Sequence, residues 1–222
     1  MVTTEATFDY RNEHDGFART YFRRIGDAVV SSIGLDTSAG QATDAVDEDL
    51  RQTLKRATKC GVNVLDTSIS ARHQRSERVI GSLIDAGVID REAVYLSSKG
   101  GHVPFDGDRP DDPGGQIVKN YVKPGIIDHS TLVHGRHCIE PGFLANQLDQ
   151  SLDNLQVNTL DCYYVHDPEV QLDANPEQHV YDQLENAFEL FERRINSGDL
   201  RSYGVATTDA FRVPRQHDRY LS

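Results

Sequence analysis

Three polar residues of different chemistry each stand at the end of a short apolar run. Asp66 ends the run 62–66, Lys99 ends 93–99 and His166 ends 160–166. Each run has the length and composition of a β-strand, and a helical pattern follows each in the chain. In a parallel α/β barrel the C-terminal ends of successive strands surround one mouth, so these side chains are expected to converge there. An acid, an amine and an imidazole meeting above a packed barrel favour a proton-transfer site.

Each of the three residues also has a plainer interpretation when it is taken alone. Asp66 can cap the next helix or pair with Arg72. Lys99 can be a salt-bridge partner, or the amine that forms a Schiff base in a barrel lyase. His166 can be a turn residue, because an Asp-Pro pair follows it. Only the combination of the three favours a shared site.

The elements that must position these residues alternate in type along the chain. The first strand is expected over Val29–Leu35 and the fifth over Ser202–Ala206. Apolar residues at spacings of three and four predict the helices. These cover 44–59, about 76–86, a segment with a leucine stripe from near 141, and a segment with an aromatic stripe over 181–195. Alternation of this kind predicts a parallel sheet with right-handed crossovers.

Two parallel architectures are compatible with that alternation. An open dinucleotide-binding sheet requires Gly-x-Gly-x-x-Gly after its first strand, whereas residues 34–40 read Gly-Leu-Asp-Thr-Ser-Ala-Gly. The pattern therefore favours an incomplete α/β barrel of the (β/α)8 TIM-barrel type, with about five of its eight units in one domain over residues 1–222. Residues 100–140 show little periodicity and are expected to form a long loop over the barrel mouth. Residues 209–222 read as a polar C-terminal tail.

Five short motifs in order make the chain resemble the aldo-keto reductases. They are Asp66-Thr67-Ser68, the run 74–81 (Gln-Arg-Ser-Glu-Arg-Val-Ile-Gly), Ser98-Lys99, the run 164–168 (Tyr-Val-His-Asp-Pro) and the run 201–206 (Arg-Ser-Tyr-Gly-Val-Ala). The resemblance extends from about Val29 to Phe211. It implies a (β/α)8 barrel that uses NADPH to reduce small aldehydes and ketones.

The resemblance also assigns roles to the three residues at the strand ends. By match, Asp66, Lys99 and His166 are catalytic: the Lys-Asp pair lowers the pKa of a proton-donating Tyr phenol, and the His orients the carbonyl. That Tyr lies five residues after the Asp in the pattern Asp-Thr-Ala-x-x-Tyr, where this chain has Ala71. Loss of a positioned general acid costs roughly 10² to 10⁴ in rate. Activity is therefore expected to be weak or lost.

The resemblance implies fewer contacts to the cofactor than the family has. The last three strands of the family, which carry most of its NADPH contacts, are missing from the pattern. At the Ser-Asn pair that holds the nicotinamide amide the chain reads Ala206-Thr207, so Thr207 is a weak cofactor-binding candidate. Asp36 stands where the family usually has Gly, and its carboxylate would face the cofactor. A non-catalytic remnant or interaction protein, and a Schiff-base lyase using Lys99, remain as alternatives.

Two further clusters of polar residues carry a weaker signal. His129, His134, His137 and Cys138, with His102 nearby, resemble a metal cluster, but their spacing is loose and a solvated loop with no metal is expected. Arg72, Arg75 and Arg78 form a basic patch. These arginines are expected to hold Glu77 and neighbouring carboxylates, and the second interpretation is that they steer an anionic substrate or cofactor.

The composition limits the partners of the protein. The net charge is −12, and the Asp-rich, Lys-poor surface is typical of a salt-adapted protein, although an ordinary acidic protein is the alternative. Such a surface disfavours nucleic acid and anionic membranes, and no apolar stretch approaches a membrane span. Three widely spaced cysteines fit a reducing, cytoplasmic location. An open barrel would expose a sheet edge, so self-association through that edge is expected.

Overall fold

The computed structural model describes residues 1–209 and is built around a five-stranded parallel sheet. Its strands are β3 (Leu35–Asp36), β4 (Val64–Asp66), β5 (Tyr95–Gly100), β6 (Cys162–His166) and β7 (Tyr203–Ala206). They neighbour one another in chain order, each parallel to the next. An unbroken order of this kind belongs to a barrel, since a doubly wound sheet reverses its order at a switch point. The structure confirms the expected partial (β/α)8 fold.

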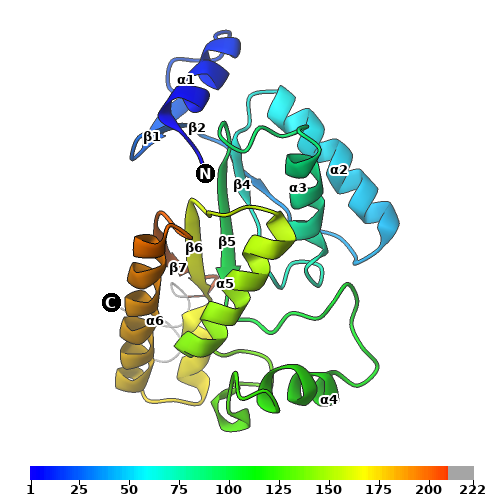
Figure 1. Cartoon of the computed structure of the whole chain (residues 1–222), viewed down its shortest axis with the longest axis vertical. Helices are drawn as coiled ribbons and strands as arrows, with labels where there is room; N and C mark the ends of the chain where they lie inside the picture. The colour runs from blue at the N-terminus through cyan, green and yellow to red at the C-terminus, as the bar shows by residue number, and fades with distance from the viewer. Residues whose placement is uncertain (210–222) are drawn as a thin grey trace.

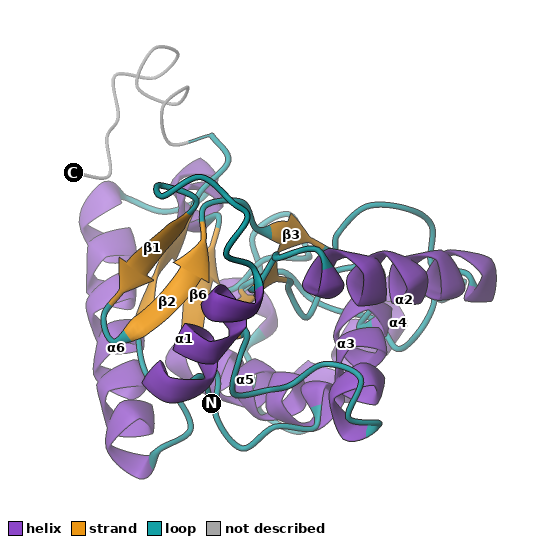
Figure 2. Cartoon of the chain, turned by 90° about the horizontal axis from the view of Figure 1, so that it is seen from above, coloured by secondary structure: helices purple, strands orange, loops and turns teal. Residues whose placement is uncertain are grey.

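Four helices follow the strands and cover one face of the sheet. They are α2 (Asp44–Lys59), α3 (Arg75–Asp85), α5 (Pro141–Leu155) and α6 (Glu177–Ser197). Figure 2 shows them arranged in an arc outside the sheet. Their apolar stripes pack on the outward side chains of the strands, and the resulting core includes Leu144, Leu148 and Phe191, which are fully buried. The leucine and aromatic stripes of α5 and α6 are therefore ordinary core faces.

The first strand differs from the prediction over Val29–Leu35. Its apolar half forms β2 (Ala28–Ser31), which pairs antiparallel with β1 (Phe22–Ile25), and only β3 joins the parallel sheet. The chain turns between β2 and β3, where Asn63 Oδ1 accepts a hydrogen bond from the Ser31 N–H at 2.7 Å. An apolar run shows that a segment is buried, but it does not show which strands the segment pairs with. The single run 29–35 therefore gives no sign that it is divided between two sheets.

The N-terminal helix α1 (Thr4–Glu13) has no counterpart in the sequence prediction. It begins at Thr3, whose side chain accepts a hydrogen bond from the Ala6 N–H. Only Thr7 is buried within it, so it lacks the apolar stripe by which helices are recognised. Figure 1 shows α1, β1 and β2 together beyond the N-terminal ends of the parallel strands, opposite the end where Asp66, Lys99 and His166 lie.

The segment 100–140 has more regular structure than the expected long loop. It contains α4 (Pro113–Ile117), a π-helical turn at Val118–Val122 and a 3₁₀ turn at His129–Thr131. Ile117, Tyr121 and Ile127 form a small core with Phe143 of α5. These elements are too short to show a period in the sequence, and packing against α5 stabilises them. Figure 1 shows the segment beyond the C-terminal end of β5.

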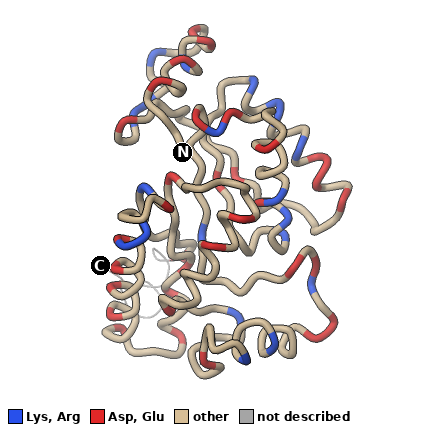
Figure 3. Tube along the Cα trace, in the orientation of Figure 1, with Lys and Arg blue, Asp and Glu red and all other residues tan. Residues whose placement is uncertain are grey.

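Several global features follow from the described residues. No helix within residues 1–209 has both the length and the apolar character that a membrane span needs. Cys60, Cys138 and Cys162 are free thiols. Figure 3 shows acidic residues distributed along α2 and α6 and through the 100–140 segment. The expected C-terminal tail 209–222 lies outside the described residues except for Asp209.

Candidate active site

Asp66 and Lys99 form a salt bridge at the C-terminal ends of adjacent strands. The register of β4 and β5 pairs Asp66 with Ser97, and Lys99 lies two residues further along the same face of β5. Lys99 Nζ donates to Asp66 Oδ2 at 2.6 Å and to the Thr67 carbonyl oxygen at 2.7 Å. Ser97 Oγ donates to Asp66 Oδ1 at 2.5 Å. The lysine side chain is 12% exposed, so the ammonium group is held in a fixed position near the mouth.

His166 ends the neighbouring strand on the same face of the sheet. The β5–β6 register pairs Lys99 with Tyr164, which lies two residues before His166. Burial lowers the pKa of His166; among neighbouring charges, Asp167 raises this pKa, His102 and Lys99 lower it, and Asp66 raises it. The strand registers place Asp66, Lys99 and His166 on one face at the C-terminal ends of β4, β5 and β6, so the structure brings the three predicted site residues to the same end of the sheet.

Ala71 lies in a well-ordered turn that begins directly after β4. The Ile69 N–H donates to the Lys99 carbonyl oxygen at 3.2 Å, and Ala71 is buried. The next three residues, Arg72, His73 and Gln74, have left-handed φ angles of 49°, 58° and 72°. Such a run is costly for residues other than glycine. The segment is thus held in an unusual conformation beside the site, although Ala71 offers no acidic proton.

The guanidinium of Arg72 helps to hold this turn. It donates to the Gln41 carbonyl oxygen at 3.0 Å and forms an ion pair with Asp47 at 2.5 Å. Asp47 also pairs with Arg75, and Arg78 pairs with Asp106. The arginines therefore hold neighbouring carboxylates, as expected from the sequence.

Glu77 was expected to be among the partners of these arginines, and this was wrong. It is fully buried, and its carboxyl accepts hydrogen bonds from Ser98 Oγ at 2.7 Å and Asn154 Nδ2 at 2.9 Å. Burial raises the pKa of Glu77. The side chain points into the interface between α3, β5 and α5. The Arg72 guanidinium is instead directed to the Asp47 carboxylate, and Arg75 and Arg78 are partly exposed.

The two residues expected near the cofactor lie at the outer strands of the sheet. Thr207 follows β7, and its hydroxyl donates to Glu169 Oε1. Asp36 ends β3, where it is exposed and accepts a hydrogen bond from the Ser38 N–H at 2.9 Å. The Thr207 hydroxyl is thus engaged by Glu169, and the exposed Asp36 carboxylate would repel a phosphate, so these two residues are a poor match to an anionic dinucleotide.

Three further polar residues, which the sequence did not place among the catalytic candidates, lie at the same end of the sheet. His102 Nε2 lies 3.0 Å from Asp167 Oδ2, and His166 Nε2 lies 3.6 Å from the same oxygen. Burial alone would raise the pKa of Asp167, but the hydrogen bond from His102 and the attraction of His166 lower it to about 2. His137 is buried, and burial lowers its pKa to about 4. The available signal was the position of His102 and Asp167 within three residues of Lys99 and His166.

The remaining loop histidines do not join this cluster. His134 pairs with Asp173 at 2.8 Å, and both side chains are more than half exposed. His129 is exposed in the 3₁₀ turn. His134 and His137 therefore do not share a site, because the β-bridge from His102 to His137 turns His137 inward and leaves His134 outside.

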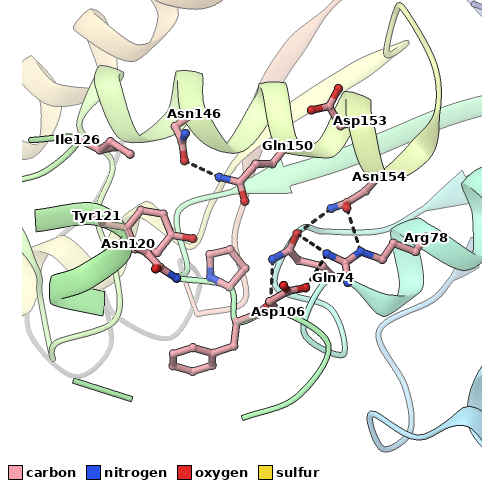
Figure 4. Close-up of a pocket in the computed structure, with 12 residues that line it drawn as sticks. Gln74, Arg78, Asp106, Asn120, Tyr121, Ile126, Asn146, Gln150, Asp153 and Asn154 are labelled. Carbon is pink, nitrogen blue, oxygen red and sulfur yellow. Dashed lines mark hydrogen bonds and ion pairs between the residues drawn. The ribbon is translucent and has the colours of Figure 1, made fainter. Parts of the chain in front are cut away.

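A separate cleft lies outside the sheet between α3, α5 and the 100–140 segment. Figure 4 shows Gln74, Arg78 and Asn154 joined by hydrogen bonds on one side of it, and Asn146 bonded to Gln150 on another. Asp66, Lys99 and His166 do not line it. The amide side chains that line the cleft mostly bind one another. Gln74 Nε2 also donates to the Phe105 carbonyl oxygen, so these side chains help to hold the 100–140 segment against α3 and α5.

Comparison with known proteins identifies the fold independently of these contacts. The model of the aldo/keto reductase family matches residues 32–219. No match to a curated protein was found. An aldo-keto reductase from Bacillus halodurans in its holo form superposes with a TM-score of 0.60 at 18% identity, covering 90% of this chain and 54% of that one.

Two other solved structures have the same architecture. A glycerol dehydrogenase from Gluconobacter oxydans gives a TM-score of 0.61 at 18% identity, with 86% of this chain and 50% of that one covered. An aldo/keto reductase from Klebsiella pneumoniae in complex with NADP and acetate gives 0.57 at 20% identity, covering 90% and 54%. The chain thus spans about half the length of these neighbours. By its family match, with the fold in agreement, the chain belongs to the aldo/keto reductase family.

Proposed function

We propose that this chain carries the carbonyl-binding part of an NADPH-dependent reductase site, acting on small aldehydes or ketones with weak or lost activity. The observation that carries the proposal is the Lys99–Asp66 pair, 2.6 Å apart at the strand ends and within electrostatic reach of His166. The weakness follows from Ala71, which leaves the matching position without a phenol.

The residues present fit the carbonyl end of this reaction better than its cofactor end. A fixed ammonium at Lys99 stabilises negative charge that develops on a carbonyl oxygen, and the His166 ring orients that oxygen. The Asp66 carboxylate keeps the ammonium in position. Bound NADPH would supply hydride, but Thr207 and the exposed Asp36 do not form a binding site for its phosphates.

The geometry disfavours the Schiff-base alternative. A nucleophilic amine needs a free lone pair. Lys99 Nζ instead donates to both Asp66 Oδ2 and the Thr67 carbonyl oxygen, at 2.6 and 2.7 Å. Both acceptor oxygens hold the Lys99 side chain in place and direct its nitrogen at Asp66 and Thr67, away from an incoming carbonyl carbon.

The test compares NADPH oxidation by the chain and by two lysine variants in the presence of a small aldehyde. We expect slow oxidation above the enzyme-free rate, lost in Lys99→Met and retained in Lys119→Met, whose lysine is exposed in the 100–140 segment. Turnover of the wild-type chain at about 1 to 10³ per second would contradict the assigned weakness. Equal rates of NADPH oxidation in the Lys99→Met and Lys119→Met variants would contradict the assignment of Lys99 to the site. Absence of both NADPH binding and turnover would favour the non-catalytic alternative.

A further inference from the structure

We propose that His102, His166 and Asp167 form a binding site for a transition-metal ion of the Zn²⁺ class. One donor atom from each residue, the two Nε2 atoms and Asp167 Oδ2, lies within 4.8 Å of the other two. Donor atoms around a tetrahedral Zn²⁺ ion at about 2.0–2.1 Å are separated from one another by about 3.3 Å. The separations from Asp167 Oδ2, 3.0 Å to His102 and 3.6 Å to His166, bracket that value.

The donor set determines which ions fit and what the site offers. Two imidazoles and one carboxylate suit Zn²⁺, Co²⁺ or Fe²⁺, whereas Mg²⁺ and Ca²⁺ prefer oxygen ligands. Three protein ligands leave a fourth position for water or for an oxygen atom of a small ligand. The side chains of His102, His166 and Asp167 are 25%, 23% and 17% exposed, so an ion can enter from the barrel mouth.

Asp167 is aimed at the two rings by contacts of its own. Its backbone N–H donates to the Ala206 carbonyl oxygen at 2.7 Å, and its φ angle of 46° is left-handed. Its Oδ1 accepts a hydrogen bond from the Thr208 N–H at 3.0 Å. Oδ2 is thereby left as the single oxygen that faces His102 and His166. A strained residue held by several bonds is typical of a functional position.

Buried side chains hold the backbone of the two histidines as well. Gln147 Nε2 donates to the His102 carbonyl oxygen at 2.7 Å, and His137 Nε2 lies 2.8 Å from the His166 carbonyl oxygen. Gln171 Nε2 lies 2.7 Å from His137 Nδ1. Both ring nitrogens of His137 are therefore engaged, which excludes it as a ligand and makes it a positioning residue. Outer contacts of this kind orient ligands in metal sites.

A simple hydrogen bond between His102 and Asp167 accounts for only part of this arrangement. His166 Nε2 points at the same carboxylate oxygen from 3.6 Å, which is too long for a hydrogen bond. The rings of His102 and His166 are nearly perpendicular, with centroids 5.0 Å apart. The two rings are therefore not stacked face to face. An ion between these atoms would satisfy all three at once.

The test is a Co²⁺ titration of the full chain without an affinity tag, followed by displacement with Zn²⁺. We expect one Co²⁺ ion per chain with the visible absorption of a four- or five-coordinate site. His102→Gln and Asp167→Asn should each weaken binding by at least tenfold, because loss of a ligand exceeds the about 10- to 100-fold effect of losing an outer contact. His134→Ala is the matched control, since His134 also pairs with an aspartate but lacks a second histidine.

The outcomes separate this site from the proposed reductase. No NADPH is present in the titration, so a failed reductase assay leaves its result unaffected. Far-UV circular dichroism establishes that each variant is folded. If His102→Gln does not fold, His102→Ala takes its place. Absence of saturable Co²⁺ binding by the wild-type chain would overturn the inference. So would unchanged binding in folded His102 and Asp167 variants, or an equal loss in His134→Ala.

Discussion

At the scale of single residues, the proposed site has an ammonium, a carboxylate and an imidazole at the strand ends and an alanine at residue 71. Lys99, Asp66 and His166 share one face of adjacent strands because side chains two residues apart point the same way. Ala71 lies in the turn after β4, in a position set by the Ile69–Lys99 backbone hydrogen bond. In the proposed function, residue 71 is therefore the position at which a general acid would have to be restored.

We predict that Ala71→Tyr increases the rate of NADPH-dependent aldehyde reduction by about 10² or more, because it restores a general acid beside the ammonium of Lys99. The measurement is NADPH absorbance decay at saturating aldehyde. The double variant Ala71→Tyr with Lys99→Met is the control and should lose the gain. A rate equal to that of the wild-type chain, in a folded variant, would show that residue 71 is not the position of the missing acid.

Glu77 should make stability depend on pH. Burial raises its pKa in the folded state, so the folded protein binds a proton more tightly than the unfolded chain. The protonated Glu77 carboxyl therefore contributes to the free energy of unfolding. This contribution is fully present below the ordinary carboxyl pKa of about 4.3, and it is lost as pH rises through the raised pKa of the folded state. Urea unfolding between pH 4 and pH 8 should show this loss in the wild-type chain and a flatter profile in Glu77→Gln.

The matched control for this experiment is Glu185→Gln, which changes an exposed carboxyl on α6. It should leave the wild-type pH profile unchanged, since an exposed group has a similar environment in the folded and unfolded states. Identical profiles for Glu77→Gln and the wild-type chain would exclude Glu77 as the source.

At the scale of elements, α3 and α5 approach each other where Gly81 lies. A Cβ atom on Gly81 would lie 2.3 Å from the Asn154 carbonyl oxygen and 2.8 Å from the Leu155 carbonyl carbon. Both atoms are backbone, so they cannot move aside as the end of a side chain would. In the same contact region Glu77 accepts hydrogen bonds from Asn154 of α5 and from Ser98 of β5.

We predict that Gly81→Ala destabilises the protein by about 3 kcal/mol, the upper part of the range for overpacked cores. An alanine in an uncrowded helix would instead stabilise it by up to about 1 kcal/mol. Gly142→Ala in α5 is the control, because its Cβ would meet only the Ile126 carbonyl oxygen at 3.4 Å. The free energy of unfolding in urea measures both. A neutral Gly81→Ala would mean that the two helices pack less closely than described.

At the scale of the whole molecule, charge dominates the surface. The net charge of −12 destabilises a compact state through self-repulsion, and salt screens that repulsion. We predict that the free energy of unfolding rises as KCl increases from 0.1 M to 1 M, where the screening length falls from about 10 Å to about 3 Å. In a double variant, Glu185→Gln with Glu189→Gln, the free energy of unfolding should rise less with KCl, because two negative charges are removed. Equal stability at both salt concentrations would favour the ordinary acidic alternative.

The sheet presents two open edges within residues 1–209. β3 and β7 each pair with one neighbour only, and Val205 on β7 is 40% exposed. Unpaired strands with apolar side chains associate readily. We predict concentration-dependent self-association in analytical ultracentrifugation, weakened by Val205→Lys. Val88→Lys, at an equally exposed turn position after α3, should have no effect. A monomer at every concentration would contradict this prediction.

The amino-acid sequence by itself determined the alternation of strands and helices and the polar residues at the strand ends. These features are local: strand and helix periods are set by neighbouring residues, and the parallel topology follows from the order of elements. Asp66, Lys99 and His166 were found for that reason, since each ends its own strand.

Tertiary structure alone decided three other features. It divided the expected strand 29–35 between a hairpin and the sheet, gave the 100–140 segment a core on α5, and brought His102 beside Asp167. Each depends on contacts between residues far apart in the chain, and the energy of such contacts comes from packing that no local pattern records. The sequence indicated His102 only as part of a loop, because nothing local in the sequence places it against a residue 65 positions away.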